Sequence, residues 1–220
     1  MMRKTPIQIL FIAMFLSNCL ILSACAPAEE YPFSPTALEK RFGDSMDEVV
    51  EDLGIDLSTA EVEEQSEEQT DITVEDIPLG ENQTASGLIL SFRNNIFYGV
   101  YYVSADAGYI YDQTIAMYAL CNEQYGEELT DEYLTEPILG VNYNAKPSEE
   151  EFVGSAERSA YVASWRAKND KVSKDAWNGE EIRFDITANS ITDNGEKWAT
   201  LGMSFEPLYF DPERMDTGSE

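Results

Sequence analysis

Two runs of alternating residues near the C-terminus, joined by Asp193-Asn194-Gly195, constrain the fold more than any other part of the chain. Asn and Gly accept positive φ at low steric cost, so this tripeptide favours a tight hairpin turn. Each run has the period of a strand with one buried and one wet face. The apolar members of the two runs are Ile182, Phe184, Ile186, Leu201, Met203 and Phe205. The pattern predicts an antiparallel hairpin.

Three further strands and a helix are predicted upstream of this hairpin. Residues 88–92 alternate in the same way, residues 96–103 are rich in aromatic and β-branched side chains, and Arg93-Asn94-Asn95 predicts a turn between them. Residues 161–166 also alternate, and residues 112–125 form a helical pattern that Asp112 can cap. We therefore predict an α+β fold, an antiparallel meander of about five strands with two main helices packed on one face.

The other main helix is predicted from Ser45 to Gly54. Ser45 and Glu48 have the spacing of a capping box, and Gly54 stands where a left-handed cap ends a helix. The segment Phe42–Gly54 resembles a motif of the BamE-like and β-lactamase-inhibitor-like (BLIP-like) small α+β domains, in which a Gly precedes a capped helix that ends in Leu-Gly. This resemblance implies a protein-binding or envelope-assembly module rather than an enzyme.

The N-terminal segment has the three parts of an export signal. Arg3 and Lys4 precede an apolar run from Ile7 to Leu22, and small residues follow it. Leu22-Ser23-Ala24-Cys25 resembles a bacterial lipobox, which implies cleavage before Cys25 and attachment of lipid, palmitate included, to its sulfur. The alternatives are secretion without lipid and a retained membrane helix. The expected location is the extracytoplasmic face of the cell membrane, with the lipid at Cys25 as the membrane contact. The body is also similar to uncharacterised lipoproteins of Gram-positive gut bacteria, in the strand with Phe92, the helix ending at Tyr125-Gly126 and the strand with Trp165.

Composition changes along the chain divide it into segments. Residues 55–86 carry many acids, few apolar residues and no Lys or Arg, which predicts a mobile acidic loop or linker. A calcium-binding or partner-docking tract is the alternative for this segment. The complete expected order is a signal peptide (1–24), a spacer (25–33), an N-terminal helical segment (34–54), the acidic loop (55–86), an α+β sheet domain (87–210) and a frayed acidic tail (211–220).

Charge and cysteine content restrict the function further. The chain has 14 basic and 42 acidic side chains and a formal net charge of −28. Such a surface repels polyanions, which argues against nucleic acid as a partner. After loss of Cys19 and lipidation of Cys25, only Cys121 remains, so no internal disulfide can form.

No catalytic residue, metal site or cofactor can be assigned from the sequence. The chain has no His, which removes Ser-His-Asp, Cys-His and His-based zinc chemistry. The candidate binding residues are Tyr98, Tyr102 and Tyr109, provided that one strand face is open; packed tyrosines are the alternative. The leading function is a non-catalytic envelope lipoprotein that binds an unidentified envelope protein. A module that binds glycan or a divalent cation is the alternative, and a carboxylate-based glycoside hydrolase is a third.

Overall fold

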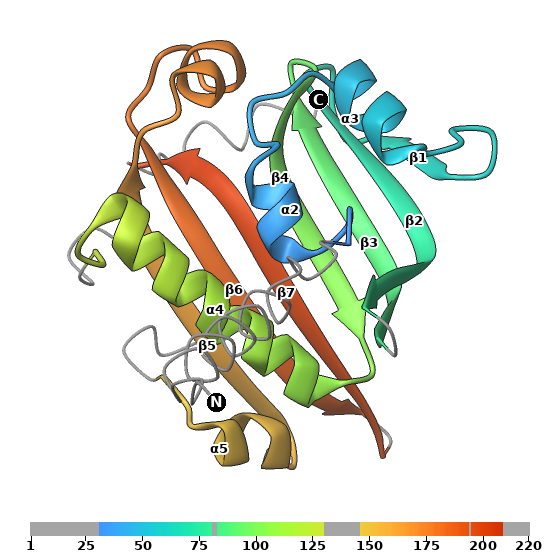
Figure 1. The fold of residues 1–220 in the computed structure, drawn as a ribbon, viewed down its shortest axis with the longest axis vertical. Coiled ribbons are helices and arrows are strands. Elements are labelled where there is room, and N and C mark those ends of the chain that lie inside the picture. Colours follow the sequence, from blue (N-terminus) through green and yellow to red (C-terminus); the bar gives the residue numbers. More distant parts are fainter. Residues whose placement is uncertain (1–30, 81–82, 130–145, 194, 209–220) are drawn as a thin grey trace, which may run out of the picture. The chain divides into compact units, whose positions relative to one another are not determined.

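The computed structural model describes residues 31–80, 83–129, 146–193 and 195–208 (Figure 1). Its helices are α2 (Pro35–Glu39), α3 (Met46–Leu53), α4 (Ala107–Tyr125) and α5 (Glu149–Gly154), with a π-helical turn η3 (Val172–Ala176). Its strands are β1 (Glu61–Glu64), β2 (Gln69–Gly80), β3 (Gln83–Arg93), β4 (Ile96–Ser104), β5 (Arg158–Ala167), β6 (Ile182–Asp193) and β7 (Glu196–Pro207). Within these ranges no helix combines the length and apolarity needed to cross a bilayer.

The predicted five-strand meander with two main helices is wrong. The strands form one seven-stranded antiparallel sheet in the order β1-β2-β3-β4-β7-β6-β5. Two meanders, β1–β4 and β5–β7, meet where β4 pairs with β7 from Gly99 opposite Ser204 to Ser104 opposite Ala199. The last strand along the chain, β7, is therefore an interior strand, because its two neighbours are β4 and β6 (Figure 1). The described helices α2 to α5 and the turn η3 accompany this sheet, rather than two main helices.

The segment 55–86, expected as a mobile acidic loop, contains β1, β2 and the start of β3. Ile72 is fully buried, and Val74 packs against the core. Their partners across the ladder, Leu90 and Leu88, are also buried. Asp71, Thr73 and Glu75 alternate with these apolar residues, so the segment has the composition of a strand with one apolar face in the core and one polar face.

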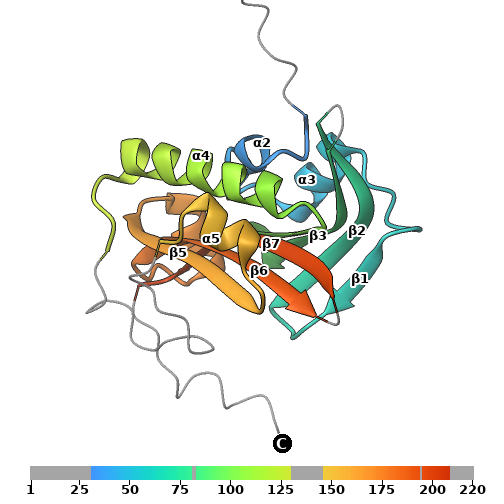
Figure 2. The same ribbon diagram turned by 90° about the horizontal axis from the view of Figure 1, so that it is seen from below.

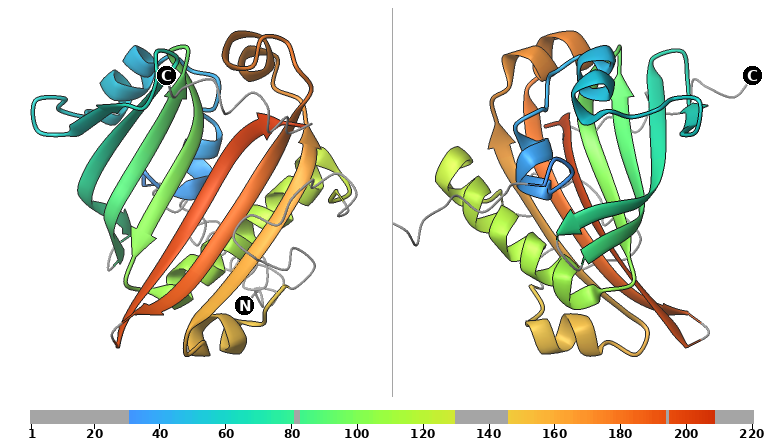
Figure 3. Two further views of the ribbon diagram at one scale, coloured as in Figure 1. Left: turned by 180° about the vertical axis from the view of Figure 1, so that it is seen from behind. Right: turned by 45° about the vertical axis from the view of Figure 1, so that its right-hand side comes forward.

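The helices lie on one face of the sheet, as views from below and from behind both show (Figures 2 and 3). α4 begins at Ala107, where the Asp106 carboxylate accepts a hydrogen bond from the Tyr109 N–H at 2.9 Å, and not at Asp112 as predicted. It ends before Gly126, which has φ 88°. The Trp165 indole on β5 donates to Asn122 of α4 at 3.0 Å, which ties the helix to the sheet.

The predicted capping box of α3 is confirmed. The Ser45 hydroxyl accepts from the Glu48 N–H at 3.3 Å, and the Glu48 carboxylate accepts from the Ser45 N–H at 2.9 Å. Gly54 ends the helix in the left-handed conformation. The hydrogen bond from the Ser45 N–H, followed by that from its hydroxyl, lowers the pKa of Glu48.

Phe42, between α2 and α3, joins the N-terminal segment to both meanders. Its ring lies 4.8 Å from that of Phe97 on β4, 5.7 Å from Phe184 on β6 and 5.4 Å from Phe205 on β7, measured between centroids. The rings of Phe184 and Phe205 also contact each other at 4.9 Å. These aromatic contacts continue the core across the junction of β4 and β7.

Candidate functional site

The predicted binding tyrosines do not share one surface. Tyr102 is fully buried on the helix-covered face, where its hydroxyl donates to the Phe33 carbonyl at 2.9 Å. Tyr109 lies in the first turn of α4 and is partly buried, and this burial, followed by the charge of Asp106, raises its pKa to about 12. Cys25, the predicted lipidation site, lies outside the described residues.

Tyr98 is buried on the other face, because β4 carries a bulge. Phe92 pairs with Phe97 but Ser91 pairs with Gly99, which leaves Tyr98 as the extra residue. A bulge of this kind reverses the alternation, so Tyr98 and Tyr102 point to opposite faces. The Tyr98 ring packs edge-on against Trp177, with the centroids 5.6 Å apart. Burial, and then the nearby carboxylates of Glu206 and Asp71, raise the pKa of Tyr98.

The face of the sheet opposite α4, here called the polar face, carries a row of small and acidic residues. Adjacent members of this row are paired across six strands from β2 to β5: Asp71, Ser91, Gly99, Ser204, Asp185 and Ser164. Gly99 lies close to the next strand, because an added Cβ would lie 3.3 Å from that of Ser204. The described helices α2 to α5 lie on the opposite face of the sheet (Figure 3).

A charged cluster occupies one end of the polar face. The Arg183 Nε donates to both oxygens of Asp185, at 3.1 and 2.9 Å. Glu206 lies opposite Arg183 in the β6–β7 ladder. The Arg93 guanidinium stacks over the Trp177 ring at 4.4 Å and pairs with Glu68 at 2.7 Å. Trp177 therefore covers part of this cluster.

Two carboxyl groups in the cluster hold their protons unusually well. Burial raises the pKa of Glu206 to about 7, and the neighbouring Asp185 charge adds to this effect. Burial also raises the pKa of Asp185, although Arg183 and a hydrogen bond from Ser164 oppose the change. Raised carboxyl pKa values occur in acid–base sites and in structural ion-pair networks alike. Here Asp185 is paired with Arg183.

The remaining thiol is unsuited to nucleophilic chemistry. Cys121 lies on the buried side of α4 and has no exposed surface. Burial, followed by the charge of Glu39, raises the pKa of Cys121 to about 12. A thiol must ionise to attack an electrophile, so Cys121 is a core residue. Among the residues that the structure describes, no group of three or more acids or cysteines is arranged to hold a metal ion.

A second charged region, here called the acidic edge, lies at the β1 side of the sheet. No Lys or Arg occurs between Arg41 and Arg93 in the sequence. α3 and β1 lie side by side there (Figures 1 and 3). The acidic edge is defined by its exposed carboxylates: Asp47, Glu48, Glu51, Asp52, Asp56, Glu61, Glu63, Glu64, Glu67, Glu68, Glu75 and Asp76.

Apolar surface accompanies these charges. Leu57 and Val62 are 43% and 47% exposed, which is unusual for large aliphatic side chains in the described part of the chain. A hollow of about 340 Å³ lies beside them between residues 55–61 and β2. Its lining combines apolar and acidic side chains, among them Ile55, Ala60, Val74, Glu61 and Glu75. The acidic edge therefore combines exposed carboxylates, two exposed aliphatic side chains and a hollow.

Sequence reasoning missed both regions for identifiable reasons. Prediction of the charged cluster required knowledge of how β6 pairs with β7 and β3 with β4. The alternation of Arg183 and Asp185 with apolar residues already indicated a polar face. The part of the acidic edge within residues 55–86 was predicted to be a linker because acids outnumber apolar residues there, whereas the acids of α3 were predicted to lie on a helix. The alternation of Ile72 and Val74 with Asp71, Thr73 and Glu75 was the signal that could have found β2.

Comparisons with known proteins leave the family open. The chain matches no protein family, no curated protein and no solved structure.

Proposed function

We propose that this protein is an extracytoplasmic lipoprotein, held by lipid at Cys25 on the outer face of a bacterial membrane, and that it is a non-catalytic module that binds a protein partner. Arg3 and Lys4, the apolar run to Leu22 and the Leu-Ser-Ala-Cys sequence support the anchor. Two acyl chains hold a protein firmly to a bilayer, whereas one chain is marginal. An anchor of this kind confines binding to partners in the envelope.

The acidic edge is the observation that carries the binding part of the proposal. It combines exposed carboxylates, of which Asp52 pairs with Arg41 and Glu68 with Arg93, with exposed Leu57 and Val62 and the hollow beside β1. The glycan alternative has less support, because Tyr98 and Tyr102 are buried on opposite faces. The hydrolase alternative also has less support, because Arg183 already occupies the Asp185 carboxylate.

The anchor is tested by labelling cells that produce the full chain with an alkyne fatty acid. The parent protein should carry the label and sediment with membranes. Cys25→Ala should lose the label and leave the membrane fraction, because Cys19, the other cysteine of the segment, follows Asn18 and not a small residue such as Ala24. A Cys25→Ala variant that stays labelled and membrane-bound would contradict the proposal.

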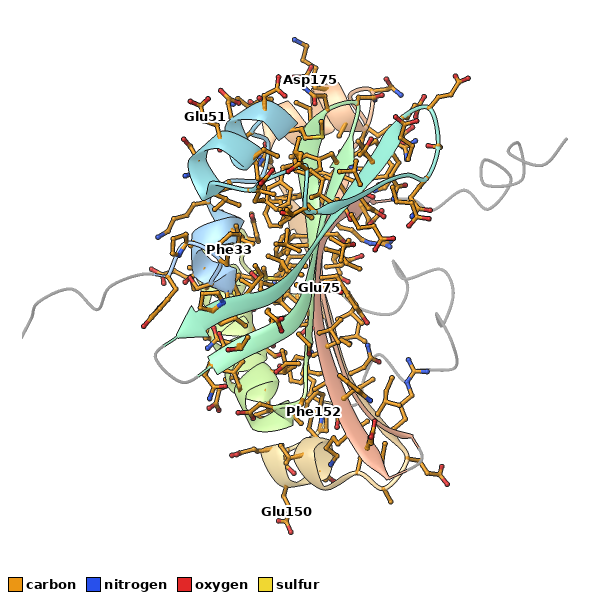
Figure 4. All side chains as sticks on the ribbon, turned by 90° about the vertical axis from the view of Figure 1, so that its right-hand side faces the viewer. Phe33, Glu51, Glu75, Glu150, Phe152 and Asp175 are labelled. Carbon is orange, nitrogen blue, oxygen red and sulfur yellow. The ribbon has the colours of Figure 1, made fainter. Side chains whose placement is uncertain are left out.

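The binding surface is tested by cross-linking intact cells that carry the anchored protein. Glu63→Gln/Glu64→Gln should abolish a discrete cross-linked adduct seen with the parent, because it removes two charges from β1. Glu149→Gln/Glu150→Gln is the matched control, since it removes two exposed charges from α5. α5 lies at the opposite end of the described unit from α3, as the positions of Glu150 and Glu51 show (Figure 4). Equal loss of the adduct in both double variants would mean that only net charge matters.

A further inference from the structure

The hairpin geometry shows which backbone groups of β1 are free. Hydrogen-bonded and non-hydrogen-bonded pairs alternate along an antiparallel ladder. The Gln65 N–H donates to the Gln69 carbonyl at 3.0 Å, and the β1–β2 register places Glu63 opposite Asp71, the next hydrogen-bonded pair. Val62 and Glu64 alternate with these residues, so their N–H and C=O groups point away from β2.

β1 is an edge strand, and its outer side is unpaired within the described ranges. Val62 and Glu64 therefore offer N–H donors and C=O acceptors to an incoming strand. Adjacent strands also select side chains, because alternate residues face alternate sides of a sheet. An added strand would meet Glu61 and Glu63 on one face, and Val62 on the other.

The side chains of β1 discriminate between partners. Glu61, Glu63 and Glu64 would repel the same strand of a second copy, and like charges directly opposite each other destabilise a strand pair. The same carboxylates attract a strand with Lys or Arg at the facing positions. Exposed Val62 and Leu57 and the adjacent hollow provide apolar contact.

We infer that β1 is a docking strand for an extended segment of the partner protein, rich in Lys or Arg and with apolar residues at intervening positions. The segment extends the sheet beyond β1 and forms backbone hydrogen bonds with Val62 and Glu64. This inference rests on the proposed function, since it names the partner chemistry and the mode of binding at the acidic edge.

The test uses a short synthetic peptide in which lysine and valine alternate, a fluorescent label on the peptide, and the full lipidated chain in detergent micelles. Val62→Pro removes the outward N–H, and proline is tolerated on an edge strand where that group faces solvent. Val62→Thr is the control, because it keeps the N–H and the β-branched shape. The proline variant should weaken peptide binding about tenfold, the effect of about one hydrogen bond, while the threonine variant binds nearly as the parent does.

Two further measurements separate strand addition from attraction by charge alone. Peptide binding should slow hydrogen exchange at the Val62 and Glu64 amides, and N-methylation of alternate peptide amides should abolish that protection. Glu63→Gln/Glu64→Gln should weaken binding more than Glu149→Gln/Glu150→Gln, and the difference should shrink at high salt because exposed charges are screened.

The outcomes distinguish the inference from the function on which it rests. If the cellular adduct depends on Glu63 and Glu64 but Val62→Pro leaves both adduct and peptide binding intact, strand addition is wrong and the binding surface stands. If the peptide binds the parent and every variant equally, the docking strand is wrong. Loss of folding in Val62→Pro would show in its circular dichroism, and the N-methylated peptide then decides the matter on the parent protein.

Discussion

Glu206, on β7, has an environment that few surface carboxylates share. Arg183 lies opposite it in the ladder, Asp185 is the next residue of β6 on the same face, and Ser204 donates a hydrogen bond to it. Burial raises its pKa to about 7, above the ordinary value of 4.5. The folded protein therefore binds more protons than the unfolded chain between these two pH values, and the free energy of unfolding falls as the pH rises through this window.

We expect Glu206→Gln to remove part of this pH dependence. At pH 8 the variant should be more stable than the parent by about 2 kcal/mol, because the parent must keep a partly buried charge there. Near pH 5 the two proteins should have similar free energies of unfolding. Urea unfolding at both pH values measures the difference. Glu196→Gln, an exposed change on the same strand, serves as the control; a parent and Glu206→Gln with parallel pH profiles would contradict the assignment.

At the residue scale, the sequence could indicate a polar face but not its partners. Alternation placed Arg183 and Asp185 on one side of a strand, and the structure confirms this. Pairing with Glu206 depends on the β6–β7 register, which alternation does not give. Tyr98 was placed beside Tyr102 by the same alternation, and the bulge in β4 reversed that order.

Elements with strong local chemistry were predictable. The capping box of α3 and the turn at Asn94-Asn95, where φ is 49° and 66°, follow from short-range hydrogen bonding and steric tolerance. The hairpin of β6 and β7 was predictable for the same reason, and Gly195 has φ 86°. β2 depends instead on pairing with β3 and on burial of Ile72, and exposed β1 depends on pairing with β2, contacts that composition concealed.

The capping box of α3 gives a direct test at the element scale. Ser45→Ala should lower the free energy of unfolding by about 1 kcal/mol, because it leaves N–H groups of the first turn without an acceptor. Ser45→Thr keeps the hydroxyl and should restore most of the loss. Urea unfolding of the three proteins at one pH measures both effects. An alanine variant as stable as the parent would show that water replaces the cap without loss.

For the whole molecule, Phe42 is the side chain whose removal should affect both meanders together. Phe42→Ala should lower the free energy of unfolding by about 3 to 5 kcal/mol, the range for a large buried aromatic residue. Circular dichroism and tryptophan fluorescence should still report one coincident transition. Phe42→Leu retains apolar volume and should lose less. Separate transitions in the parent would mean that the meanders unfold independently, and that the junction of β4 and β7 does not couple them.

The interior position of β7 in the sheet has a consequence for the order of events in biosynthesis. Strands β1–β4 are complete early in translation, but β4 has no neighbour on its inner side until residues 196–207 have emerged. The inner backbone hydrogen-bonding groups of β4 in a nascent chain therefore stay unpaired until β7 has emerged, and the sheet cannot be completed before then.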